Sequence, residues 1–462
     1  MNINLIIQVL ILLYPSLFLL YQLFLYRLAS RTHQISFNTP LDKYPFLSII
    51  VPTKGENIQV IQELIDNISQ LEWDKKNIEV IIVSDDNEQY FEELLAKLKI
   101  PENLNVKLYR REKKQGYKSG ALLYGFEKSR GDLIFIMDVD SRLPKDALIR
   151  AYNKMLTGGC DAVALQWIGY SKNRHSKLAK GIMASTLFGV KALFNGKENA
   201  NLVIFPVGSG TLFKREALQA VGGWDYRLIQ DDLEIGTRLV NKGKKICASD
   251  VPIEIEVPDN FFSFYIQQTR WAMGTAEVLR HRIWYIITSK ISLVKKIDMI
   301  IHLLQYTTAI SMFLGSLLLI ALAPFVGSND VLRSLLFLFW VIILALYAYV
   351  IYNISLKLGF SKKEALFSMG RLSAFYAAIS PFILHSFLKG LLSTKKTYIV
   401  TPKGGSKAGI RYKVIAIIGI FGIAYLLSAI IYLLSHDYVT ALWLAYYSFG
   451  YLYTSLTFKR EL

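Results

Sequence analysis

The stretch Leu133-Ile-Phe-Ile-Met-Asp138-Val-Asp140 is the most informative part of this 462-residue sequence. Its run of apolar, largely β-branched and aromatic residues predicts a buried strand. Two carboxylates, Asp138 and Asp140, follow the strand with one residue between them. In an extended segment or a turn, both side chains can reach one hard divalent cation. Because Asp-x-Asp also occurs in many turns that bind nothing, the surrounding sequence has to decide between a metal site and a simple turn.

Strand-like runs and helical patterns alternate on both sides of this stretch. The expected strands are Leu47–Val51, Ile78–Val83, Val106–Tyr109 and Leu133–Met137, and the expected helices are Val60–Leu71, Tyr90–Leu98 and Lys118–Lys128. This alternation predicts an α/β domain over residues 43–258, with a mostly parallel sheet between helices. Ligands of such sheets bind beyond the carboxyl ends of the strands, so polar residues there are candidate site residues.

Polar residues of this kind follow two more of the expected strands. Pro52-Thr53-Lys-Gly-Glu56 follows the first strand, and Asp85-Asp86 follows the second. Carboxylates there can accept hydrogen bonds from a ribose or a base N–H, or can simply cap helices and form turns. Lys118 opens a helix after Gly116, a place where a lysine suits phosphate oxygens, although an ordinary loop lysine has the same pattern.

Three further motifs lie closer to the membrane-like part of the chain. They are the Gly208-Ser209 turn, the run Gln230-Asp231-Asp232, and the run Gln267-Gln-Thr-Arg270-Trp271. A buried carboxylate of the second motif could act as general base toward a hydroxyl, whereas helix capping is its plain alternative. In the third, Gln267, Arg270 and Trp271 share one helical face. Arginine can bind diphosphate and an indole can cover a sugar ring, although a membrane-interface belt would use the same residue types.

Long uncharged, apolar runs frame the α/β domain. They are Met1–Tyr26, Met299–Asn329, Ser334–Leu356, Val414–Ser435 and Tyr438–Phe458. Each is close to or above the roughly 20 residues that cross a bilayer, so five spans are expected. The first run has no basic start and no small-x-small cleavage site, which disfavours a cleaved signal peptide. The shorter run Leu372–Leu388 is expected to be an interfacial or re-entrant helix.

The charge balance fits a membrane protein. Formal net charge is +17, from 53 Lys and Arg against 36 Asp and Glu, yet only 19% of residues are charged and mean hydropathy is +0.32. These values exclude global disorder and disfavour a plain soluble enzyme. Basic residues cluster after the first span and in segment 357–413, which places both segments and the α/β domain on the cytoplasmic side of the plasma membrane. Anionic membrane lipids then account for much of the charge, and no nucleic-acid partner is expected.

Cys160 and Cys247 are the two cysteines of the chain. Two cysteines cannot form a disulfide framework or a four-ligand zinc site, and the pair suits a reducing compartment.

In their order along the chain, these motifs resemble those of membrane-integrated, processive-type family 2 glycosyltransferases, such as cellulose and hyaluronan synthases. The run Tyr398-Ile-Val-Thr401-Pro-Lys403 is similar to the gating-loop motif of that family, and the resemblance covers about residues 45–405. It implies a GT-A (Rossmann-like) α/β domain joined to an α-helical transmembrane bundle. The sequence departs from the family pattern where Gln230-Asp231-Asp232 replaces Thr-Glu-Asp and where Gln268-Thr269 lacks the arginine of some members.

The resemblance also implies residue roles. Asp85 would contact the uracil of a UDP-sugar, and Asp138 and Asp140 would hold Mg²⁺ or Mn²⁺ on the diphosphate. Asp232 would be the base, with Asp231 left as an alternative, and Trp271 would stack on the acceptor sugar. Donor binding is assigned to Pro52, Thr53, Glu56, Asp85, Asp86, Lys118, Asp138, Gln267 and Arg270, acceptor binding to Trp271, Gly208, Ser209 and Asp231, and a gating-type loop to Tyr398, Thr401 and Lys403.

The predicted function is therefore inverting, metal-dependent transfer of a sugar from a nucleotide sugar to a growing polysaccharide at the cytoplasmic membrane face, with coupling to export left open. A membrane lipid acceptor is the alternative. A transporter with a regulatory nucleotide-binding domain would need ionisable residues within its spans, and the runs lack them. The expected units are a first span at 1–27, the catalytic domain at 43–258, interfacial helices at 259–296, two spans at 297–357, an interfacial helix and gating-type loop at 358–413, and two spans at 414–458.

Overall fold

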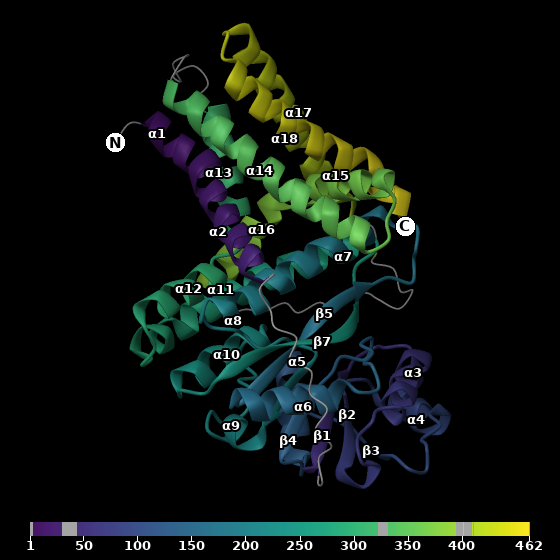
Figure 1. Cartoon of the computed structure of the whole chain (residues 1–462). Helices are drawn as coiled ribbons and strands as arrows, with labels where there is room; N and C mark the ends of the chain where they lie inside the picture. The colour runs from purple at the N-terminus through teal and green to yellow at the C-terminus, as the bar shows by residue number, and fades with distance from the viewer. Residues whose placement is uncertain are drawn as a thin grey trace.

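The structure is a computed structural model that describes residues 3–29, 44–321, 331–393, 401, 409 and 411–461. An α/β domain and an assembly of long helices lie one above the other (Figure 1). The chain begins among the long helices, builds the α/β domain, and then returns to the helical part, where it ends.

A seven-stranded sheet in the order β3-β2-β1-β4-β6-β5-β7 forms the centre of the α/β domain. The strands are β1 (Leu47–Thr53), β2 (Ile78–Ser84), β3 (Asn105–Arg110), β4 (Leu133–Ile136), β5 (Ala162–Tyr170), β6 (Thr211–Lys214) and β7 (Ile246–Glu256). The four strands expected from the sequence are confirmed as β1 to β4, and they pair in parallel. The sheet is mixed rather than wholly parallel, because β6 runs antiparallel between β4 and β5.

Helices cover both faces of this sheet and give it two apolar cores. In the N-terminal part they are α3 (Ile58–Ser69), α4 (Glu88–Lys97), α5 (Tyr117–Lys128) and α6 (Ala147–Gly158), followed by α7 (Lys177–Val190), α8 (Lys197–Asn199), α9 (Arg215–Gln219) and α10 (Asp231–Asn241). Successive side chains of a strand point to opposite faces. Accordingly, Leu133 and Phe135 of β4 pack with α3 and α6, whereas Ile134 and Ile136 pack with α5 and α10.

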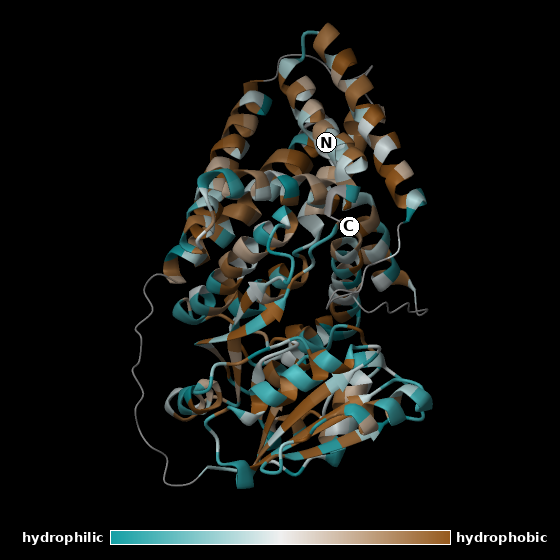
Figure 2. Cartoon of the chain, turned by 90° about the vertical axis from the view of Figure 1, so that its right-hand side faces the viewer, coloured by the Kyte–Doolittle hydropathy of each residue, from teal (hydrophilic) through white to brown (hydrophobic). Residues whose placement is uncertain are grey.

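Long helices from both ends of the chain form the second part. They are α1 (Ile3–Gln8), α2 (Tyr14–Ala29), α11 (Phe261–Thr288), α12 (Leu293–Leu303), α13 (Thr307–Ala321), α14 (Val331–Lys357), α15 (Lys362–Ala378), α16 (Ser380–Leu392), α17 (Tyr412–Leu434) and α18 (Tyr438–Thr457). Hydrophobic residues dominate the helices farthest from the sheet (Figure 2). Among the described residues, three helices are long and apolar enough to cross a membrane, namely Ile6–Ala29, Val331–Lys357 and Tyr412–Leu434.

Two bent helix pairs raise the number of candidate spans to as many as five. The pair α12 and α13 is bent by 59°, although a single span was expected at Met299–Asn329. The pair α15 and α16 is bent by 51° inside the expected interfacial run Leu372–Leu388, and either a broken span or a re-entrant loop has this shape. Pro381 at the start of α16 explains the break, because proline removes a helix N–H and clashes with the preceding turn.

The expected span at Tyr438–Phe458 forms the helix α18, which is not among the candidate spans. Five tyrosines and several Ser and Thr residues lower its hydropathy, although it packs along α17.

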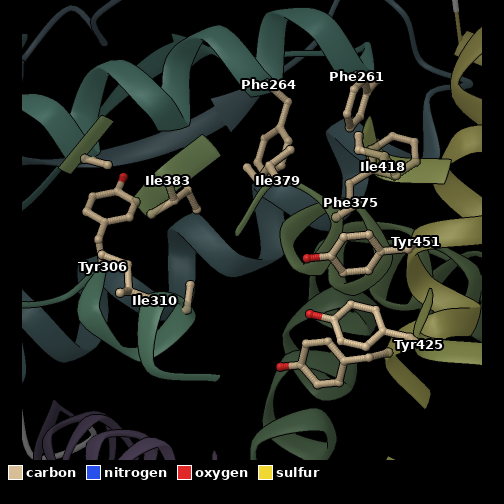
Figure 3. Close-up of a cluster of buried hydrophobic side chains, with 14 of the residues drawn as sticks. Phe261, Phe264, Tyr306, Ile310, Phe375, Ile379, Ile383, Ile418, Tyr425 and Tyr451 are labelled. Atoms are coloured by element: carbon tan, nitrogen blue, oxygen red, sulfur yellow. The ribbon is translucent and has the colours of Figure 1, made fainter. Parts of the chain in front are cut away.

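An aromatic core joins α11 to α15 and α18 (Figure 3). Phe261 and Phe264 of α11 pack with Phe375 of α15 and Tyr451 of α18, and the ring centroids of Phe261 and Phe375 lie 5.0 Å apart. The Tyr451 hydroxyl lies 2.8 Å from the hydroxyl of Ser380. The helix that carries the Gln-x-x-Arg-Trp motif is therefore packed directly on the membrane-type helices.

Cys160 and Cys247 form a disulfide with their Cα atoms 6.0 Å apart. The interpretation of the two residues as reduced cysteines is therefore wrong. Parallel pairing of β5 with β7 places Val163 opposite Cys247, which brings the segment containing Cys160 next to it. A sequence separation of 87 residues gives no sign of this pairing.

Candidate active site

A cavity of about 680 Å³ extends from the carboxyl end of β4 to the membrane-type helices. Its wall includes the segment after β4, the start of α10, one face of α11, and parts of α2, α7 and α14. The predicted site residues that line it are Lys118, Asp138, Asp140, Gly208, Ser209, Asp231, Asp232, Gln267, Arg270 and Trp271. Folding thus brings together motifs that are spread over about 150 residues of sequence.

The Asp138-Val-Asp140 turn is held in place by Ser209. The backbone N–H of Asp138 donates to the Ser209 Oγ at 2.9 Å, and the Ser141 hydroxyl lies 2.8 Å from the same oxygen. Asp138 keeps about a third of its side chain exposed, whereas Asp140 is buried. The Gly208-Ser209 turn therefore has a direct structural role in setting the position of the two carboxylates.

Lys118 lies between the carboxylates of the site. Its Nζ is 2.7 Å from Asp138 Oδ1 and 3.9 Å from Asp231 Oδ2, and it donates to the Gly208 carbonyl at 2.7 Å. Gly116, just before α5, has φ of +74°, and a Cβ there would lie 2.3 Å from the Cβ of Tyr226. Only glycine tolerates both the positive φ and the close approach of Tyr226, so the turn that presents Lys118 depends on Gly116.

Asp231 and Asp232 start α10, and they are held differently. Asp232 Oδ1 accepts hydrogen bonds from the backbone N–H of Leu233 at 2.8 Å and from Gln230 Nε2 at 2.9 Å. The Oδ2 atom of Asp231 is buried and has no hydrogen-bond partner within the described part of the chain. Burial, assisted by the nearby carboxylates and opposed by Lys118, raises the pKa of Asp231 to about 7. Burial also raises the pKa of Asp232.

A buried ionic network fixes α10 against α11. The Arg282 Nε donates to Glu234 Oε1 at 2.9 Å, and the Arg238 Nη2 donates to Glu234 Oε2 at 2.6 Å. Arg282 also pairs with Asp225, whose pKa stays lowered despite burial because Arg227 and Arg282 donate to its carboxylate. Buried charges are tolerated when every one is paired, so this network holds the two helices in one relative position.

The donor-binding residues expected at the ends of β1 and β2 form a second group, away from the lining of this cavity. Both carboxylate oxygens of Asp85 accept hydrogen bonds from the Arg111 guanidinium, at 2.7 and 2.6 Å. Asp86 accepts from the backbone N–H of Gly55 at 2.6 Å and from the Ser84 hydroxyl at 2.8 Å. Pro52, Thr53 and Glu56 belong to this group by position, at the end of β1 and in the following turn. A base contact of Asp85 stays a prediction, and it would have to coexist with Arg111.

Comparisons with known proteins decide the family. Residues 48–222 match the profile described as glycosyl transferase family 2. The chain is also 56% identical over 457 residues to a probable glycosyltransferase of Sulfolobus acidocaldarius, and the alignment covers 99% of this chain and 98% of that protein. The chain belongs to glycosyltransferase family 2.

More distant relatives of this glycosyltransferase differ in the acceptors that their names imply. A probable glucomannan 4-beta-mannosyltransferase of Arabidopsis thaliana is 27% identical over 266 residues, which cover 55% of this chain and 47% of that protein. A beta-monoglucosyldiacylglycerol synthase of Trichormus variabilis is 29% identical over 233 residues, which cover 50% of this chain and 49% of that protein. The chain therefore aligns with about half of each of these relatives.

Among solved structures, a mannosyltransferase of Pyrobaculum calidifontis in complex with GDP-Man and Mn²⁺ shares the fold of this glycosyltransferase. The TM-score is 0.50 at 18% identity, and the match covers 82% of this chain and 98% of that one. The expected GT-A fold and the assignment as an enzyme are confirmed.

Sequence reasoning missed several residues that shape the site of this glycosyltransferase. Arg111 locks Asp85 and also donates to the carbonyls of Gln115 and Tyr117, so it shapes the turn before Lys118. Trp167 donates from Nε1 to the Ser209 carbonyl at 2.7 Å, and Glu256 lines the cavity at the end of β7. Glu256 could have been found as an acidic residue at the end of a strand, but its strand, β7, was not among the predicted strands.

The loop predicted to be of the gating type is only partly described. Tyr398 and Lys403 lie outside the described residues, so their assignment stays a prediction. Thr401 is described and buried, and it is not part of the cavity lining.

Asp138 and Asp140 fit a divalent metal ion by the chemistry of their donor atoms. Both are carboxylates on the wall of one cavity, and hard cations such as Mg²⁺ and Mn²⁺ prefer oxygen ligands. Within the described ranges, no cluster of three or more His, Cys, Asp or Glu side chains could hold an ion. The pair therefore suits an ion that takes its remaining ligands from water and from phosphate oxygens.

Proposed function

We propose that this glycosyltransferase moves a sugar from a nucleoside-diphosphate sugar, such as a UDP-sugar, to a hydroxyl of a carbohydrate or lipid acceptor, with inversion at the anomeric carbon. One observation carries the proposal: the cavity joins a carboxylate pair suited to a metal, two cations, and a second carboxylate pair suited to a base. Binding of GDP-Man and Mn²⁺ by the Pyrobaculum mannosyltransferase of the same fold is consistent with it.

The donor end of the reaction depends on charge. A metal ion held by Asp138 and Asp140 would neutralise the negative charge that develops on the departing diphosphate. Lys118, already at the Asp138 carboxylate, is within reach of phosphate oxygens at the same place. Arg270 lines the same cavity and is suited to bind a diphosphate in a bidentate manner.

The acceptor end depends on the Asp231-Asp232 pair. We assign the base to Asp232, because Gln230 and the Leu233 N–H orient its carboxylate through Oδ1 and leave Oδ2 for the acceptor hydroxyl. Asp231 contributes a second carboxylate in the same cavity, with a pKa raised by burial to about 7. Burial also raises the pKa of Asp232, which makes its carboxylate a better acceptor for the hydroxyl proton as the bond to the anomeric carbon forms. Trp271 would cover the acceptor sugar.

The acceptor class has two candidates. A growing polysaccharide follows from the resemblance to processive synthases and from the glucomannan mannosyltransferase among the relatives. A membrane lipid is favoured by the apolar part of the cavity wall, and a glucosyldiacylglycerol synthase is also a relative. The catalytic domain would face the cytoplasm, because the basic segments of the chain lie on its side of the predicted spans.

A donor panel tests the proposal. Purified full-length protein would be incubated with UDP-, GDP- and other nucleotide sugars in the presence of Mn²⁺ or Mg²⁺, and nucleotide release would be measured. The double variant Asp138→Asn with Asp140→Asn should lower release about a hundredfold or more and remove metal binding in calorimetry. Asp146→Asn, which changes a half-buried aspartate that pairs with Arg150 outside the site, is the matched control. Unchanged release and metal binding in the double variant would refute the metal site.

A further inference from the structure

The cavity has one charged end and one end built from hydrocarbon side chains. The charged end holds the predicted catalytic and metal-binding carboxylates. The hydrocarbon end, called the apolar wall below, consists of Phe18 and Leu19 of α2, Phe188 and Val190 of α7, and Leu344 and Ile351 of α14. None of the described lining residues from α2, α13, α14, α15 or α18 carries a charge, and the lining lysine of α8, Lys197, is paired with Asp298. The two ends belong to one continuous cavity.

Four of the six side chains of the apolar wall belong to helices that can cross a membrane. The helix Ile6–Ala29 includes α2, and it and α14 are two of the three long candidate spans. The faces of α14 differ, because Leu335, Leu338 and Leu346 are between 50% and 59% exposed, whereas Ile351 in the cavity wall is 4% exposed. One face of α14 is therefore suited to contact lipid, while its other face lines the cavity at the same depth.

Hydrogen-bonding capacity distinguishes the possible occupants of this end. Each sugar ring of a polymer carries several hydroxyls, and burying a hydroxyl without a partner is costly. The six side chains of the apolar wall provide no partner, and the hydroxyl of the adjacent Tyr347 is hydrogen-bonded to Ser185. The other polar lining residues of α2 and α7 are Gln22 and Thr186, which are too few to satisfy the hydroxyls of several sugar rings. A hydrocarbon chain needs no hydrogen-bond partner. Its transfer from the bilayer to the apolar wall costs little free energy, because lipid tails are as apolar as leucine.

We propose that the apolar wall binds the hydrocarbon chain of a lipid acceptor, whose hydroxyl reaches Asp231 and Asp232 at the other end of the cavity. This inference rests on the proposed function and decides between its two acceptor classes. The polar side chains of Gln22, Gln305 and Ser373 also line the cavity and can bind a polar head group. The volume of about 680 Å³ matches a site for one small amphiphile and its head group.

A pair of alanines on α14 allows a matched test. Ala348 lines the cavity, whereas Ala345, three residues earlier, is exposed on the outer surface. Ala348→Phe should fill the hydrocarbon end, and Ala345→Phe adds the same side chain to the same helix without entering the cavity. Both variants would be measured as full-length protein in phosphatidylcholine nanodiscs, with the donor identified by the panel and with methyl, octyl and dodecyl glucoside as acceptors.

Chain-length dependence is the first readout. The unaltered protein should use dodecyl glucoside better than methyl glucoside. Ala348→Phe should lower dodecyl transfer about tenfold or more relative to Ala345→Phe. Because a dodecyl chain partitions into both nanodisc preparations equally, the comparison between the variants isolates the cavity. Equal dodecyl transfer by both variants, or a high-mass polymer made from donor alone, would overturn the proposal.

A second readout does not need turnover. Dodecyl glucoside with a photoreactive diazirine at the chain end should label peptides of α2, α7 or α14, and Ala348→Phe should reduce this labelling while Ala345→Phe leaves it. Labelling that is equal in both variants would refute the apolar wall as the binding site. If no nucleotide sugar is turned over while this labelling pattern is obtained, the proposed function fails and the lipid site stands.

Discussion

At the scale of single residues, Asp231 is the most unusual group in the site. Its carboxylate is buried, has an Oδ2 atom without a hydrogen-bond partner in the described part of the chain, and lies close to two other carboxylates. Its pKa is raised to about 7, compared with about 3.9 for an unperturbed aspartate. A raised pKa means that folding favours the protonated form, so the stability contributed by this group is full below about pH 4 and is lost as the pH rises through about 7.

Asp231→Asn should therefore stabilise the protein more at pH 8 than at pH 5. Each pKa unit corresponds to about 1.4 kcal/mol, so the gain should be roughly 2–3 kcal/mol larger at the higher pH. Thermal unfolding in detergent at both pH values measures this difference. A gain that is equal at pH 5 and pH 8 would show that the carboxyl does not titrate in this range.

The same carboxylate pair predicts how activity depends on pH. If the ionised carboxylate of Asp232 must accept the acceptor proton, kcat/KM should rise as the pH passes the raised pKa of Asp232 and then level off. Initial rates over pH 5 to 9 with a saturating metal ion measure the profile. Asp232→Asn should abolish transfer and leave donor binding nearly unchanged, whereas a variant that keeps its turnover would exclude Asp232 as the base.

At the scale of helices, α11 connects the acceptor site to the base. One of its faces carries Gln267, Arg270 and Trp271 into the cavity, and Gly274, one turn later, lies against Gln230. A Cβ at Gly274 would lie 2.8 Å from Gln230 Oε1 and 2.9 Å from Gln230 Cβ. The absence of a side chain there leaves space for the glutamine that hydrogen-bonds Asp232.

Gly274→Ala should displace Gln230 and disturb the orientation of Asp232. We expect kcat to fall about tenfold and the donor KM to stay within about twofold, because the donor end is not touched. Gly370→Ala is the control, since a Cβ at this helical position meets nothing within 4 Å. The control should keep full activity and gain about 0.5–1 kcal/mol of stability from better helix propensity. An unchanged kcat in Gly274→Ala would remove Gln230 from the list of positioning residues.

At the scale of the whole molecule, the helical part and the α/β domain are joined by buried polar contacts as well as by the aromatic core. Lys197 of α8 pairs with Asp298 of α12 at 2.9 Å, and the Tyr21 hydroxyl of α2 donates to the same carboxylate at 2.5 Å. These contacts bring α2 to the catalytic domain, next to the cavity that Lys197 also lines.

The predicted membrane orientation can be tested by cysteine labelling. Lys362 and Ser435 are both exposed and lie at opposite ends of the helical part in the predicted topology. The two native cysteines are paired and buried, so they should not react. A membrane-impermeant maleimide added to intact cells should label Ser435→Cys and spare Lys362→Cys. The reverse pattern would place the catalytic domain outside.

The sequence by itself determined the features that depend on local order: the alternation that builds β1 to β4, the uncharged runs, and the motifs at strand ends. Burial leaves a periodic trace in neighbouring residues, so these could be predicted. The Arg111–Asp85 pair, the Cys160–Cys247 disulfide, the antiparallel β6 and the bend between α12 and α13 could not be predicted in this way. Only the tertiary structure decided these features and the cavity that joins carboxylates to an apolar wall, because each arises from contacts between segments or from packing that no local pattern encodes.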